Sequence, residues 1–230
     1  MTEQAHLPIL KRVGIFLIVV GVVDSLMFFY TWKNNIIYSS NFNIFAIVAG
    51  IFLLRGNLRA TSLVQWFSAF VLACQLTVVA TWPFLQPISL ILAYLRFETM
   101  FSLSFAILYV FIVGSYIWVY RQLASSPVQA ARAAAGRKKR SMKIPTYLGI
   151  FGVSFVILLT TILLRNNPLV TTAQRLAAEQ VKGDYQLQAK SFDIKPVDQN
   201  NNLITATVTA WNDREMKNII VKWQAPAERH

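Results

Sequence analysis

The residue that most clearly demands a chemical explanation is Asp24, a carboxylate in the middle of the apolar run at residues 13–32. A charged side chain at the centre of a bilayer costs about 2.5–3.5 kcal/mol, so we expect Asp24 to face protein or water and to have a partner. Gln75 and Thr77 lie in another apolar run and form with Asp24 the predicted intramembrane polar site. This site would be an ion or proton site, a contact to another membrane subunit, or a structural hydrogen bond. Other candidate partners are Ser102, Ser104 and Arg96.

Other residue types that commonly carry chemistry are scarce. The single cysteine, Cys74, lies in an apolar run, and the two histidines, His6 and His230, lie near or at the chain ends. This leaves no disulfide framework and no Cys/His metal spacing. The sequence also lacks the patterns of serine hydrolases, P-loop proteins and zinc metalloproteases. We therefore predict that the protein is not an enzyme and uses no cofactor or metal.

The elements that must position Asp24 are predicted to be membrane helices. The chain is 55% hydrophobic and 14% charged, whereas a soluble domain is about 25% charged. Long apolar runs of this kind match a hydrocarbon core of about 30 Å and predict five transmembrane helices. The predicted spans are residues 13–32, 42–54 (or from residue 36), 61–82, 99–120 and 145–164.

Two features refine these spans. Pro83 is expected to end the third, and residues 84–98 form either a short interfacial helix or the start of one helix of about 34 residues, near 50 Å long. Arg96 and Glu98 are predicted to lie at the outer interface and to contact lipid headgroups. Small residues at helical spacing predict close helix packing within the chain. They are Gly14 and Gly21 in the first span, and Ala46 and Gly50 in the second.

The net charge of +12 is concentrated in the loops on one side of the predicted spans. Basic residues in such loops stay on the cytoplasmic side, so this charge predicts topology rather than nucleic-acid binding. The N-terminus is therefore expected in the cytoplasm, and an odd number of spans places the C-terminus outside. A basic connector, residues 121–144, contains a short helix that Ser126 would cap and Gly136 would end. Its basic run either binds anionic lipid or only fixes topology: Arg137, Lys138, Lys139 and Arg140.

Residues 166–230 have the composition of a soluble domain. An amphipathic helix is predicted from Pro168 to Val181, followed by strands at 185–195, 203–211 and 217–224. The second strand alternates, with a row of threonines on one face, and this row and the sheet edges are candidate docking surfaces. In outline, over the last third of the chain, this order is similar to the exported domains of some respiratory-complex assembly factors.

The sequence thus predicts a mainly α, polytopic membrane protein with a small α+β domain. Residues 1–120 would form a four-helix transmembrane bundle, 121–144 the connector, 145–165 the fifth helix, and 166–230 an extracytoplasmic helix and three-stranded antiparallel meander. The predicted function is that of a non-enzymatic accessory or assembly protein of a bacterial inner (plasma) membrane, which binds the bilayer and another membrane protein or itself. The alternative is a small transporter or channel that uses Asp24.

Overall fold

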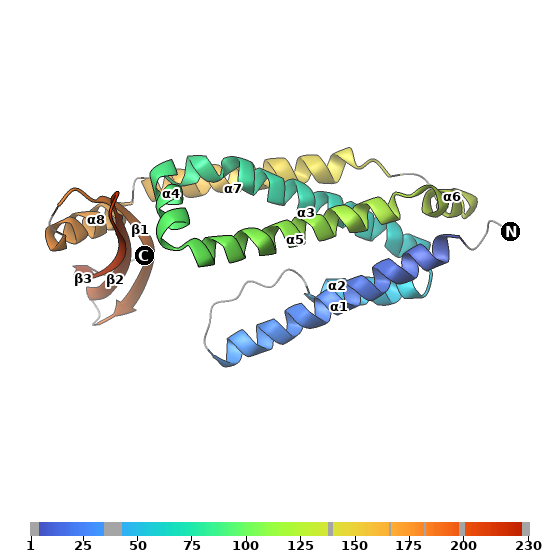
Figure 1. The fold of residues 1–230 in the computed structure, drawn as a ribbon, viewed down its shortest axis with the longest axis horizontal. Coiled ribbons are helices and arrows are strands. Elements are labelled where there is room, and N and C mark those ends of the chain that lie inside the picture. The colour runs from blue at the N-terminus through green and yellow to red at the C-terminus, as the bar shows by residue number, and fades with distance from the viewer. Residues whose placement is uncertain are drawn as a thin grey trace. The chain divides into compact units, whose positions relative to one another are not determined.

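The fold was analysed in a computed structural model, which describes residues 5–34, 43–137, 140–165, 167–181, 183–197 and 201–226. Within these ranges the chain forms helices and a three-stranded sheet (Figure 1). The helices are α1 (His6–Lys33), α2 (Asn43–Leu54), α3 (Leu58–Leu85), α4 (Ile88–Phe97), α5 (Thr99–Leu123), α6 (Ser126–Ala134), α7 (Lys143–Arg165) and α8 (Pro168–Gln180). The strands are β1 (Gln186–Pro196), β2 (Asn201–Trp211) and β3 (Met216–Pro226).

The chain divides into two compact units, which we treat separately. The first, the bundle unit, comprises Met1–Val78 and Tyr109–Val153. The second, the sheet unit, comprises Val79–Leu108 and Ser154–His230. Helix α4 and the sheet therefore belong to one unit, and α1, α2 and α6 belong to the other.

Four helices in the described ranges are long and apolar enough to cross a membrane: α1, α3, α5 and residues Lys143–Leu163 of α7. The predicted second span is different, because α2 has 12 residues. Such a helix is about 18 Å long and falls short of a hydrocarbon core of about 30 Å. The residues that the longer version of this span adds, 36–41, lie outside the described residues, as does residue 42, the first of the shorter version.

Helix α2 nevertheless packs along α1, and two of the predicted small residues, Gly14 and Gly50, make the contact. A Cβ atom built on Gly50 would lie 2.6 Å from the carbonyl oxygen of Gly14, and one built on Gly14 would lie 2.8 Å from that of Gly50. Only glycine fits at both positions, which confirms the prediction of close packing within the chain. A similar contact joins α7 to α3, where a Cβ on Gly149 would lie 2.8 Å from the Phe70 carbonyl oxygen.

The prediction that Pro83 ends the third span is wrong, because α3 continues to Leu85. Proline removes one i→i−4 hydrogen bond and its ring crowds the carbonyl four residues earlier, and α3 ends two residues after Pro83. The chain then turns through Pro87, whose extended ψ of 135° begins α4. Helix α4 ends at Glu98, which has a non-helical ψ of 46°. The stretch is therefore a separate short helix, and the single long helix is excluded.

The connector contains the predicted short helix, α6, although Ser125 rather than Ser126 occupies its N-cap position. Gly136 follows its end with φ +68°, a left-handed conformation that favours glycine. Its N–H donates to the Ala133 carbonyl oxygen at 2.9 Å, so the helix closes as the sequence predicts.

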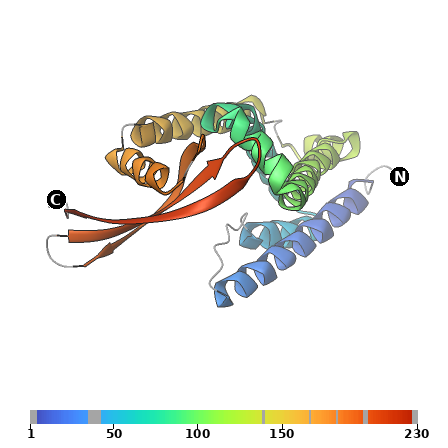
Figure 2. The same ribbon diagram turned by 60° about the vertical axis from the view of Figure 1, so that its left-hand side comes forward.

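The C-terminal domain is an antiparallel meander in the order β1-β2-β3, with α8 against one face (Figure 2). Asn167 begins α8, because its Oδ1 accepts from the Leu169 N–H at 2.9 Å. The core between α8 and the sheet is apolar. Its buried residues are Ala173 and Ala177 of α8 and Ala206, Val208 and Val221 of the sheet. The opposite face carries the threonine row of β2. A β-bulge at Lys190 interrupts the pairing of β1 with β2, whereas β3 pairs with β2 in an unbroken register.

Candidate functional site

Asp24 lies on α1 in the bundle unit and is half-buried. It interacts electrostatically with Tyr116 of α5, a residue that the sequence analysis did not name. The other two members of the predicted polar site lie on α3. The Thr77 hydroxyl donates to the Ala73 carbonyl oxygen of its own helix at 2.8 Å. The Gln75 backbone carbonyl accepts from the Tyr109 hydroxyl of α5 at 2.8 Å.

These contacts make tyrosines of α5 the polar residues that face α1 and α3. A tyrosine is apolar along its ring and polar at its tip, so it can join packed membrane helices through one hydrogen bond. The serine candidates instead behave locally: Ser102 Oγ donates to the Tyr94 carbonyl oxygen at 3.1 Å and closes the corner between α4 and α5.

Helix ends that carry basic residues gather at one end of the bundle unit, which we call the basic end. The turn between α2 and α3 lies beside the start of α1, because a Cβ on Gly56 would lie 3.1 Å from Leu7 Cδ2. Phe16 of α1 stacks edge-on against Trp118 of α5, with ring centroids 5.1 Å apart. One buried apolar cluster ties these ends together: Leu10, Val13, Ala49, Leu53, Val64, Val119, Leu123 and Val128.

A guanidinium is buried within the basic end. Arg132 of α6 is 3% exposed, and its Nη1 donates to Gln65 Oε1 of α3 at 3.2 Å. Its Nε has no hydrogen-bond partner in the described part of the chain. Burial, and secondly the positive charge of Arg140, lower the pKa of Arg132. Arg132 therefore holds α6 on the bundle at the cost of a buried charge, with which no carboxylate in the described ranges forms an ion pair.

The predicted basic run differs from Arg132 in exposure. Arg137 and Arg140 are exposed, and Lys138 and Lys139 lie outside the described residues. The sequence analysis treated the positive charge of the connector, residues 121–144, only as loop charge that sets topology or binds lipid. The burial of Arg132 could have been expected from its spacing, since Val128 and Arg132 are four apart and therefore share one face of α6.

The guanidinium of Arg96 makes contacts within the chain. Its Nη1 donates to the Asp213 carbonyl oxygen, in the turn between β2 and β3, at 2.7 Å. Its guanidinium carbon also lies 5.4 Å from the centre of the Phe97 ring. Glu98 is half-buried, and its backbone forms the break after α4, where its carbonyl accepts from the Ser102 N–H. Thus Arg96 links α4 to the C-terminal domain.

Further contacts fix α4 against the threonine face of the sheet. Ser89 Oγ donates to Gln186 Oε1 at 2.6 Å, and the Lys190 ammonium lies 4.8 Å from the centre of the Tyr94 ring. Lys190 is the bulged residue of β1, so the bulge directs its side chain toward α4. An apolar cluster fills the centre of this junction, with Leu90, Ala93 and Trp211 buried.

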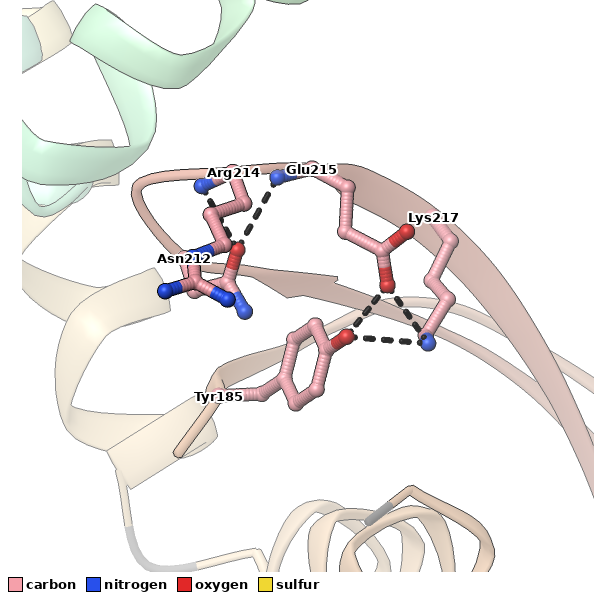
Figure 3. A network of polar contacts seen from close by, with 5 residues as sticks. All are labelled: Tyr185, Asn212, Arg214, Glu215 and Lys217. Carbon is pink, nitrogen blue, oxygen red and sulfur yellow. Dashed lines mark hydrogen bonds and ion pairs between the residues drawn. The ribbon is translucent and has the colours of Figure 1, made fainter. Parts of the chain in front are cut away.

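The turn between β2 and β3 contains a compact polar network (Figure 3). Asn212 Oδ1 accepts from the backbone N–H groups of Arg214 and Glu215, at 2.8 and 2.9 Å. The Tyr185 hydroxyl donates to Glu215, and the Lys217 ammonium lies 2.9 Å from the same carboxylate. The bond from Tyr185, then that from Lys217, lowers the pKa of Glu215, and the pKa of Lys217 is raised chiefly by Glu215.

We also searched for metal-binding groups and for similar proteins. Within the described ranges, no three His, Cys, Asp or Glu side chains are grouped so that they could hold a metal ion. No protein-family model, curated protein or solved structure matches this chain.

Proposed function

We propose that this chain is a non-enzymatic accessory or assembly protein of a bacterial inner (plasma) membrane. It binds another membrane protein through its helices and through its C-terminal domain. The observation that carries the proposal is the incomplete cover of the sheet. Helix α8 covers one face, α4 reaches only the Trp211 end of the other, and both edge strands lack a further partner strand in the described chain.

The edge at β3 is the better docking surface of the two. An edge strand presents unpaired backbone N–H and C=O groups, which an extended segment of a partner can bind. A bulge interrupts β1, whereas β3 keeps an unbroken register with β2 over 11 residues. Ile220 on β3 is 61% exposed, which gives the partner an apolar contact on an otherwise polar face.

The membrane helices provide a second surface. None of the residues in the most apolar window of α5 is buried within the chain, and only 6% of that of α7 is. Lipid covers such surfaces equally well, so the helices support the proposal without selecting a partner. The sheet, which lies in the polar part of the chain, is the more specific of the two surfaces.

The proposed topology places the N-terminus in the cytoplasm and the C-terminal domain outside. The shortness of α2 does not change this placement of the two ends. The turn at Gly56 lies beside the start of α1, so the chain has returned to that end of the bundle before α3 begins. If α1, α3, α5 and α7 cross, the return of the chain through α2 to the start of α1 counts as a fifth passage, so the number of passages is odd. The basic residues of the basic end then lie on the cytoplasmic side, where positive charge is retained.

A pull-down from membranes solubilised in mild detergent tests the proposal. The full chain should capture a defined membrane protein, and the chain without residues 166–230 should lose it. Ile220→Lys should weaken capture, while Ile194→Lys, at an isoleucine 50% exposed on β1, serves as the matched control. Capture that survives the deletion and both substitutions would rule out the C-terminal domain as the docking site.

The second candidate, a small transporter or channel, is supported by Asp24 and its electrostatic interaction with Tyr116 within the bundle unit. A half-buried carboxylate among membrane helices is a candidate ion or proton site. Ion flux into proteoliposomes that disappears with Asp24→Asn and persists with Thr77→Val would favour this function. Equal flux in wild type, Asp24→Asn and empty liposomes would exclude it.

A further inference from the structure

The sheet unit contains an open cleft between α4 and the adjoining end of the sheet. Its volume is about 380 Å³, and both walls belong to this one unit. Ligand pockets in proteins have volumes of about 300–1,000 Å³, so the cleft has room for a small polar molecule or a lipid headgroup. The lining of the cleft includes Leu92 and Arg96 on the α4 wall, and Asp184, Trp211 and Asp213 on the sheet wall.

The cleft brings together charges of both signs that do not neutralise one another. Arg96 uses one N–H on the backbone carbonyl of Asp213, and a guanidinium has several more donors. No ion pair in the described chain involves Arg96, Asp184 or Asp213. The three exposed charged groups are therefore available to a ligand that carries both a positive and a negative group.

Trp211 adds a second observation that points to a ligand. This residue lines the cleft and is 3% exposed, yet its indole Nε1–H has no acceptor in the part of the chain that the structure describes. A buried donor without an acceptor is unfavourable, and an oxygen-rich ligand would relieve it.

The surroundings of the cleft are those of an amphiphile site. Helix α4 connects α3 to α5, two helices long and apolar enough to cross a membrane. Ile88, Leu92 and Leu95 of α4 are 63, 59 and 54% exposed. Leu92 also lines the cleft, so an apolar lip adjoins the charged interior. A lipid could place its chains against the lip and its headgroup in the cleft.

We propose that this cleft binds a phospholipid headgroup that carries a phosphate and a primary amine, as in phosphatidylethanolamine. The phosphate pairs with Arg96, and the ammonium donates to the carboxylates of Asp184 and Asp213. Charge-assisted hydrogen bonds of this kind are the strong ones, and a primary ammonium can donate three of them. A trimethylated amine can donate none, so the site distinguishes the two headgroups. This lipid site is independent of the proposed protein partner.

Native mass spectrometry of the delipidated full chain tests the proposal. The protein is titrated with phosphatidylethanolamine, phosphatidylcholine and phosphatidylglycerol that have the same acyl chains. We expect the wild type to prefer the first lipid by about tenfold over each of the others. Arg96→Gln and Asp184→Asn should each abolish the preference. Asp184→Asn is the cleaner variant, because no hydrogen bond or ion pair in the described chain uses this carboxylate.

Two control variants and a soluble probe complete the experiment. Arg214→Gln and Asp193→Asn remove the same charges from exposed sites that do not line the cleft, and both should keep the preference. Soluble phosphoethanolamine that competes with the lipid would assign the site to the headgroup alone, and failure to compete would show that the acyl chains are needed. Equal binding of the three lipids to wild type, or an unchanged preference in Asp184→Asn and Arg96→Gln, would overturn the proposal.

Discussion

The Gly14 and Gly50 backbones touch where α1 and α2 cross, since a Cβ atom added to Gly50 would lie 2.6 Å from the Gly14 carbonyl oxygen. Both neighbours are backbone atoms, which cannot move aside as a side chain does. The contact is therefore the point that sets the distance between the two helices. It also ties the short α2 to a helix that is long enough to cross the membrane.

Gly50→Ala should destabilise the bundle unit by about 1–3 kcal/mol, because the added methyl group overpacks the crossing. Equilibrium unfolding in mixed detergent–SDS micelles, followed by circular dichroism, measures the effect. Gly114→Ala is the matched control, since nothing lies within 4 Å of its Cβ position. A Gly50→Ala protein as stable as Gly114→Ala would mean that α1 and α2 do not cross at these glycines.

A second pair of glycines separates a packed position from an open one on the same helix. A Cβ on Gly149 of α7 would lie 2.8 Å from both the Ala73 Cβ and the Phe70 carbonyl oxygen, whereas nothing lies within 4 Å of one on Gly152. Gly149→Ala should lower the free energy of unfolding by about 1–3 kcal/mol, and Gly152→Ala should leave it unchanged or raise it. The same micelle assay compares them, and equal effects would contradict the packing of α7 on α3.

Substitution of Gln65 and substitution of Arg132 should change the free energy of unfolding by different amounts. Gln65→Leu leaves the Arg132 guanidinium buried without its acceptor, and we expect a loss of about 1–3 kcal/mol in the free energy of unfolding. Arg132→Met removes the charge and its desolvation together but leaves the buried Gln65 amide without its donor, so it should cost less than Gln65→Leu. Arg137→Met, at an exposed arginine, is the control. If Arg132→Met were the more damaging change, the guanidinium would have an anionic partner rather than Gln65 alone.

Glu215 and Lys217 should make the β2–β3 hairpin most stable between their ordinary pKa values of 4.5 and 10.5. The pKa of Glu215 is lowered in the fold, so its contribution is present above pH 4.5 and is lost as pH falls through the lowered value. The pKa of Lys217 is raised, so its contribution is present below pH 10.5 and is lost as pH rises through the raised value.

The measurement is the unfolding midpoint of wild type and Glu215→Gln across this pH series. Glu215→Gln should unfold at a slightly lower temperature near neutral pH, and the difference should vanish in acid, where the wild-type carboxylate is protonated. The effect is small because the groups are exposed. Asp193→Asn, at another exposed carboxylate of the sheet, shows whether the loss of any such charge has the same effect. A difference that persists in acid would point to a steric cause.

Much of the architecture follows from periodicity in the sequence. The domain after the last apolar helix, its amphipathic helix and its three strands all lie within a few residues of the predicted ranges, because alternation in β2 and turn residues around it specify a meander. The close packing of α1 and α2 at their glycines was equally predictable, since small residues at helical spacing permit close approach of two helices.

The site was less predictable, because it depends on which helix faces which. Tyr116 and Tyr109 meet α1 and α3 through tertiary packing, and nothing in the α5 sequence marks them as partners rather than interfacial aromatics. The contact of Arg96 with the C-terminal domain was not predicted because only its own helix was considered, whereas a turn more than a hundred residues later supplies an acceptor. The short α2, Asn43–Leu54, in contrast matches the predicted range of residues 42–54 to within one residue.

The bulge at Lys190 also limits stoichiometry. A sheet that is regular along β3 and irregular along β1 can lengthen in one direction only. Two copies joined edge to edge through β3 would present only the bulged β1 strands at their margins. Growth would then stop after a single addition, and the result is a closed pair instead of a fibre.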